Sequence, residues 1–118
     1  MKIAVIGSRT LRVDLESYIP AECTTIVSGG AKGIDACAAE FARAKGLVLI
    51  EHRPDYTRHG RGALLQRNLE IIKTAELMFA FWDGKSKGTK HAMDNCIKAG
   101  KRVRLYVWDG SAFVHKIR

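Results

Sequence analysis

The chain has 118 residues, 47% of them hydrophobic and 27% charged, which is typical of one folded domain. Its formal net charge of +8 favours acidic partners such as nucleotides, nucleic acid or anionic metabolites. Because no apolar run approaches the roughly 20 residues that span a bilayer, we expect a soluble protein without a membrane partner.

The N-terminus enters an apolar strand pattern at once and lacks the features of a secretory signal, so we expect a cytoplasmic location. Cys23, Cys37 and Cys96 are odd in number, widely spaced and without a Cys-x-x-Cys pair. This pattern argues against a disulfide framework and against a metal site. Cys37 and Cys96 fall on the apolar stripes of predicted helices, where a thiol acts as a small buried hydrophobe. No cofactor is predicted.

Apolar runs rich in Ile, Val, Leu and Phe predict five strands, at residues 2–6, 24–28, 47–51, 77–81 and 102–107. Helical patterns lie between them at about 11–18, 34–42, 62–73 and 86–99. This order predicts an α/β fold, a Rossmann-like three-layer sandwich with a mainly parallel five-stranded sheet. We assign residues 1–110 to one nucleotide-binding domain and residues 111–118 to a C-terminal tail.

The loops of the predicted fold fall into two sets. Those that lead from a helix into a strand contain Gly46 and Gly100, which are expected to cap the preceding helices. Those that lead from a strand into a helix are rich in Gly, Lys and Arg, and span 7–9, 28–35, 52–62 and 82–89. Because open α/β sheets bind ligands at the carboxyl ends of their strands, we predict a binding site at this edge.

Two of these loops predict phosphate binding. The glycines of residues 28–33 let the backbone approach a ligand, and the helix that follows points its free N–H groups and positive dipole end to the same place. Residues 83–89 form a second entry of this kind, in which Ser86 is also a candidate N-cap. Arg67 and Asn68 either brace the loops or contact the ligand. Tyr56 and Trp82 lie in or beside the same loops, where either could stack on a base, although partial burial in the core is favoured for Trp82.

The segments 7–9, 28–35, 67–68 and 81–89, in this order, resemble the SLOG superfamily, which joins the DNA-processing protein DprA to the Lonely Guy phosphoribohydrolases. The chain is most similar to the small YspA/YpsA-related branch, up to about Val107. The resemblance implies a Rossmann-like fold, a nucleotide-derived ligand and frequent dimerisation. By motif match it also implies these ligand-binding residues: Gly7, Ser8, Arg9, Ser28, Gly29, Gly30, Lys32, Gly33, Asp35, Arg67, Asn68, Asp83, Gly84, Ser86, Gly88 and Thr89.

The chain departs from this pattern at one catalytic position. The phosphoribohydrolases carry a glutamate shortly after Gly-Thr, whereas here Gly88-Thr89 is followed by Lys90, His91, Ala92 and Met93. We therefore assign no catalytic residue and expect binding without rapid turnover.

Three functions follow from these observations. The leading hypothesis is a sensor, carrier or sequestering protein for a nucleotide derivative such as ADP-ribose or NAD. The second is DprA-like binding of single-stranded nucleic acid, favoured by basic residues outside the loops: Lys98, Lys101, Arg102, Arg104, Lys116 and Arg118. The third is hydrolysis of an N-glycosidic or phosphate bond, with the carboxylate supplied by Asp35, Glu51 or Asp83.

A homodimer is also expected. Its basis is an apolar band wider than one helix face requires, consisting of Leu64, Leu65, Leu69, Ile71 and Ile72.

Overall fold

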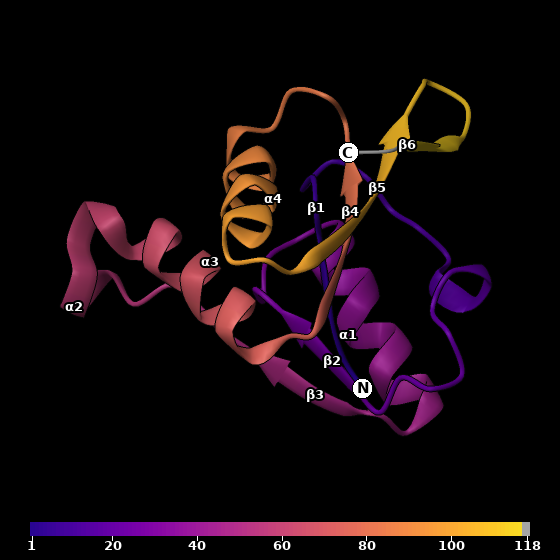
Figure 1. The fold of residues 1–118 in the computed structure, drawn as a ribbon, viewed down its shortest axis with the longest axis horizontal. Helices are drawn as coiled ribbons and strands as arrows, with labels where there is room; N and C mark the ends of the chain where they lie inside the picture. The colour runs from indigo at the N-terminus through magenta and orange to yellow at the C-terminus, as the bar shows by residue number, and fades with distance from the viewer. Residues whose placement is uncertain (117–118) are drawn as a thin grey trace.

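Six strands form one sheet in the computed structural model, which describes residues 1–116 (Figure 1). In the order across the sheet they are β3 (Val48–Glu51), β2 (Thr25–Ser28), β1 (Lys2–Gly7), β4 (Leu77–Trp82), β5 (Arg102–Trp108) and β6 (Phe113–Lys116). β1 to β5 pair in parallel, and β6 pairs antiparallel with β5. The predicted Rossmann-like α/β fold is confirmed.

Helices cover both faces of the sheet. α1 (Ile34–Lys45) packs on β1, β2 and β3, while α4 (Lys87–Lys98) packs on β4 and β5, and α3 (Ala63–Thr74) packs on α4 (Figure 1). A short helix, α2 (Tyr56–His59), precedes α3, and two 3-10 turns occur, η1 (Leu15–Ser17) and η2 (Gly60–Gly62). Within residues 1–116, no helix combines the length and the apolarity that crossing a membrane requires.

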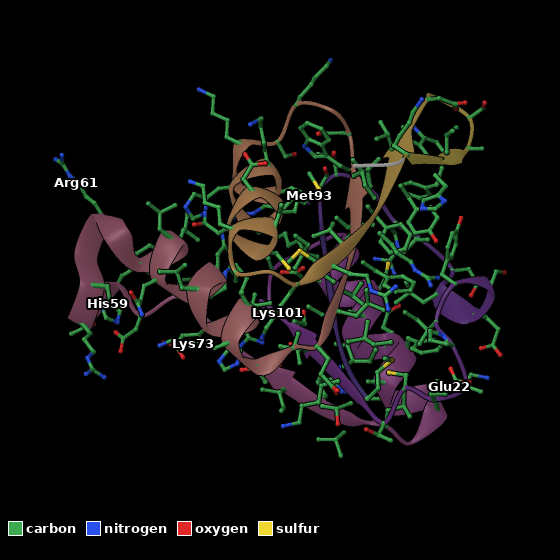
Figure 2. The ribbon with its side chains drawn as sticks, in the orientation of Figure 1. Glu22, His59, Arg61, Lys73, Met93 and Lys101 are labelled. Carbon is green, nitrogen blue, oxygen red and sulfur yellow. The ribbon has the colours of Figure 1, made fainter. Side chains whose placement is uncertain are left out.

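The sheet has a hydrophobic core on each of its two faces. The strands contribute to both cores because successive side chains of a strand alternate between the faces. In β1, Ile3 and Val5 pack with α1, whereas Ala4 and Ile6 pack with α3 and α4. Met93 of α4 belongs to the second core, and Figure 2 shows it between the helix and the sheet. The continuous apolar runs therefore reflect burial on two sides, as the sequence predicts.

The helix predicted at residues 11–18 is wrong. The structure has only the 3-10 turn η1 there, although Leu15 is buried in the core on the α1 side. Asp14 is extended, and its side chain accepts a hydrogen bond from the amide of Glu16, which starts the turn locally. Pro20 follows closely and lacks the N–H that a longer helix would need.

The segment expected as a tail contributes the sixth strand. A turn at Asp109, whose carboxylate accepts hydrogen bonds from the amides of Ser111 and Ala112, reverses the chain after β5. β6 then pairs with β5 in the register Tyr106 to His115 and Trp108 to Phe113. A sheet with one strand more than predicted results.

Lys101 has a structural task that the sequence does not reveal. Its ammonium group donates hydrogen bonds to the carbonyls of Ile72, Lys73 and Ala75, the last at 2.7 Å. These carbonyls end α3 and have no partner further along the helix. Figure 2 shows Lys101 beside this end of α3, near Lys73. Lys101 was expected among residues that favour nucleic acid, whereas the structure uses it as a helix cap.

Candidate ligand-binding cleft

The main cleft has a volume of about 620 Å³ and lies at the carboxyl ends of β1 and β4. The loops after these two strands form its floor, and the first turns of α3 and α4 form its walls. β1 is the strand from which the chain winds in both directions, to β2 on one side and to β4 on the other. Open α/β sheets bind their ligands at such a topological switch point.

Most of the predicted ligand residues line this cleft: Gly7, Ser8, Arg9, Asp35, Arg67, Asn68, Asp83, Ser86, Gly88 and Thr89. The others lie outside its lining: Ser28, Gly29, Gly30, Lys32, Gly33 and Gly84. Ala31 is the residue of the glycine-rich loop 28–33 that lines the cleft. The structure therefore brings the motifs after β1 and β4 together and sets the glycines after β2 behind them.

Several polar groups of the 28–33 loop are bonded within the protein. The guanidinium of Arg67 donates to the carbonyl of Gly29 at 2.7 Å, and that of Arg53 donates to the carbonyl of Gly30 at 3.1 Å. A Cβ on Gly29 would meet the Arg67 guanidinium at 2.4 Å, so the glycine makes room for this bond. Arg67 thus braces the loop while also lining the cleft.

A carboxylate from the protein occupies the positive end of α1. Asp35 is 6% exposed and accepts a hydrogen bond from the amide of Ala31 at 3.1 Å. Burial raises the pKa of Asp35, although this hydrogen bond and the nearby charge of Arg67 oppose the rise. Burial likewise lowers the pKa of Arg67, with Asp35 opposing the change. The anion that the α1 dipole favours is supplied internally.

The N-terminus of α4 is different because no side chain of residues 1–116 caps it. Ser86 holds the N-cap position, but its hydroxyl bonds to the side chains of Ser8 and Asp83, each at 3.0 Å, and not to the helix. The first turn of α4 contains no acidic residue. Its unpaired amides and positive dipole end are therefore available to an anion in the cleft.

Asp83 shapes the loop that leads into α4. Its carboxylate accepts hydrogen bonds from the amides of Lys85 and Ser86, both at 2.8 Å. Partial burial opposes ionisation, but the hydrogen bonds from Ser86 and Lys85 prevail and hold the pKa of Asp83 below its usual value. This carboxylate stays ionised at neutral pH and serves the turn.

Two residues in the first turn of α4 have features that the protein itself does not use. A Cβ built on Gly88 would meet no atom within 4 Å, and the residue lines the cleft. Thr89 also lines the cleft, is 7% exposed, and makes no hydrogen bond through its hydroxyl to residues 1–116.

The cleft includes residues that the sequence reasoning did not assign to it, among them Thr10, Leu64, Leu65 and His91. The side-chain amide of Asn68 lies 3.3 Å from Nδ1 of His91 and donates to the carbonyl of Gly88, so it joins α3 to α4. His91 follows Lys87 by four residues, and this helical spacing places both on the same face. The spacing was the available signal.

A sheet wound in both directions from β1, with a cleft of this size at the switch point, defines a Rossmann-like α/β protein. The model of the YspA, cpYpsA-related SLOG family (YAcAr) matches residues 1–59, half of the chain, and the chain belongs to this family. Membership indicates a nucleotide-related ligand in general terms.

Gene 61 protein of Mycobacterium phage D29 is 38% identical to the chain over 81 residues. The match covers 64% of this chain and 65% of the phage protein, just under two thirds of the latter. No solved structure gives a significant match.

Proposed function

We propose that the cleft binds a phosphate-bearing nucleotide derivative, such as ADP-ribose or NAD, with a phosphate at the N-terminus of α4. The protein then acts as a sensor, carrier or sequestering protein. The observation that carries this proposal is Gly88, which faces the cleft from the uncapped first turn of α4 with open space at its missing side chain.

Gly88 lies in the first turn of α4, where no atom of residues 1–116 outside the helix's own backbone requires a glycine. Glycine in a helix costs about 0.5–1 kcal/mol relative to alanine. At Gly7, by contrast, the close approach of protein atoms requires a glycine, because a Cβ would meet the Phe81 carbonyl oxygen at 2.3 Å. Gly62 has the same open space but lies outside the cleft lining, whereas Gly88 lies within it, so we attribute the glycine at position 88 to a ligand that comes close to the backbone.

Hydroxyl and charged groups surround the same position. Thr89 offers an unpartnered hydroxyl, and the exposed side chains of Arg9 and Lys87 line the cleft. A phosphate provides acceptors for all three groups. The apolar side of the cleft, with Ile6 and Leu64, supports packing against a base or sugar.

Binding without turnover fits the residues that follow Thr89. Ala92 and Met93 are buried in the core, Lys90 pairs with Asp94 at 2.8 Å, and the His91 ring lies near Asn68. None of these supplies the carboxylate that glycoside hydrolysis employs. Asp35 lies on the cleft and contributes an acceptor for a sugar hydroxyl.

The first experiment identifies the ligand. Small molecules released from the purified, denatured protein are analysed by mass spectrometry, and binding of ADP-ribose, NAD and nucleoside monophosphates is measured by calorimetry. We expect an adenine nucleotide derivative and no product by chromatography after long incubation with stoichiometric protein. Multiple turnovers that vanish in Asp35→Asn would replace binding by an enzymatic function.

The second experiment tests the position of the phosphate. Thr89→Val keeps the shape of the side chain and removes its hydroxyl, so we expect at least tenfold weaker binding, about 1.4 kcal/mol. Thr57→Val, at an exposed position on α2, is the matched control and leaves affinity unchanged. Equal affinities of the two variants would contradict the assigned site.

We further propose a homodimer in the cytoplasm. The buried free thiols of the three cysteines suit a reducing compartment. Of the predicted apolar band, Ile71 and Ile72 are buried in the core, whereas Leu65 and Leu69 are 49% and 39% exposed. Tyr56, 59% exposed, lies on the arm of α2 that extends away from the sheet (Figure 1). We propose that a second copy of the chain covers Leu65, Leu69 and Tyr56. Sedimentation at tens of micromolar should then show a dimer, and the variant Leu65→Lys should be a monomer.

A further inference from the structure

A second surface lies on the α1 side of the sheet, over β5 and β6, where Tyr18, the residue after η1, covers part of Tyr106, with ring centroids 4.9 Å apart. α1 packs on β1, β2 and β3. On β5, alternation places Arg102, Arg104, Tyr106 and Trp108 on this side, and Val103, Leu105 and Val107 on the side of α4. The antiparallel pairing adds Phe113 and His115 of β6. These six residues, from Arg102 to His115, are called the β5–β6 face below.

Aromatic rings on this face pack into a continuous layer. The ring of Tyr106 stacks on that of His115 with centroids 5.0 Å apart, and on that of Phe81 at 5.2 Å. Trp108 contacts Phe113 edge-on at 5.0 Å. Trp108 and Phe113 are partly exposed and His115 is exposed, so the layer reaches the solvent. The rings are held in place before any partner binds.

The two arginines of the face are exposed, and within residues 1–116 neither forms an ion pair. Arg104 lies over the ring of Phe79, 5.5 Å from its centroid, so the ring orients the guanidinium without neutralising it. By contrast, Arg12 and Lys45 elsewhere on this side are paired with Glu40 and Glu16. None of the six side chains of the face is acidic. The face combines free positive charge with aromatic rings.

We propose that the β5–β6 face binds a single strand of nucleic acid, with phosphates on Arg102 and Arg104 and bases stacked on Trp108 and His115. Positive charge beside exposed rings is the arrangement that binds single strands without sequence preference. The net charge of +8 adds long-range attraction. This surface is separate from the cleft, and the inference does not depend on the ligand proposed there.

The test measures anisotropy of a labelled 20-mer of dT, and of U, at several salt concentrations. We expect the double variant Arg102→Ala with Arg104→Ala to bind at least tenfold more weakly. Loss of two phosphate contacts lowers the slope of log K against log salt by about 1.4. The matched control removes the same charge from Arg58 and Arg61 on the α2 arm, where Figure 2 shows Arg61 pointing into solvent. This control keeps the wild-type slope and loses less than twofold.

A second readout separates stacking from charge. In Trp82→Phe, Trp108 is the tryptophan that remains, so its fluorescence reports on the face alone. We expect the oligonucleotide to quench it and free AMP at the same nucleotide concentration to leave it unchanged. Circular dichroism and the Tm verify that each variant is folded.

Three results would overturn the inference. They are no binding of the 20-mer by the wild-type protein, equal losses in the two double variants, or a change in sedimentation in the Arg102 and Arg104 variant without a change in anisotropy. The last result would identify the face as a contact between copies of the chain.

Discussion

Replacing Gly88 by alanine is expected to stabilise the fold and weaken ligand binding. Gly88 lies in the first turn of α4, and its φ is not in the left-handed region. The added methyl group meets no protein atom within 4 Å outside the helix's own backbone, so the helix gains part of the interior preference for alanine, up to about 1 kcal/mol. For a domain of this size the Tm rises by about 2–4 °C.

The same methyl group occupies the cleft where the phosphate is proposed to approach the backbone. We expect the affinity for the released ligand to fall at least tenfold, about 1.4 kcal/mol. Calorimetry measures binding, and urea unfolding without ligand measures stability. The control is Gly62→Ala, at the N-cap of α3, where a Cβ also meets open space outside the cleft lining. The reasoning fails if Gly88→Ala binds as tightly as Gly62→Ala, or if it destabilises the ligand-free protein.

Three further predictions concern buried and capping side chains. Lys101→Met removes the hydrogen bonds to the end of α3 and should lower the free energy of unfolding by about 2 kcal/mol. The control Lys98→Met, on the exposed surface of α4, should change it by less than about 0.5 kcal/mol. Urea unfolding measures the free energy of unfolding of both variants. The pKa of Asp35 is raised above 3.8 in the folded state. Its contribution to the free energy of unfolding is therefore complete below this pH and is lost as the pH rises through the folded pKa. Because asparagine does not titrate, the free energy of unfolding of Asp35→Asn should rise relative to that of the wild type as the pH rises. The pKa of Asp83 is lowered, so its contribution to the free energy of unfolding is present above pH 3.8 and is lost as the pH falls through the folded pKa. Asp83→Asn should therefore be less stable than the wild type at neutral pH, and this difference should shrink in acid. A difference that does not change with pH would contradict the assigned hydrogen bonds.

The strands and the site edge could be predicted from the sequence because they depend on local patterns. Apolar runs locate β1 to β5, and the unequal distribution of Gly, Lys and Arg indicates the edge of the sheet where the cleft lies. β6 could not be predicted in this way because four residues with three exposed side chains show little apolar pattern. Its pairing depends on the turn at Asp109 and on the partner strand.

The role of the 28–33 loop depends on distant residues. The pattern of glycines predicts an anion cradle, but the direction of its peptide groups is fixed by Arg67, which lies 38 positions beyond Gly29 in the chain. Arg118, one of the basic residues expected to favour nucleic acid, lies outside the described residues. By contrast, the buried positions of Cys37 and Cys96 followed from helical spacing alone and are confirmed.

The bonds of Lys101 have a mechanical consequence for the cleft. α3 and α4 form its walls with their first turns, and Lys101 follows α4 while holding the last carbonyls of α3. Lys101 therefore joins the two helices that form the walls, α3 and α4, at the end of α3 that lies away from the opening of the cleft. Any tilting of α3 against α4 at the opening would leave this end joined by the bonds of Lys101.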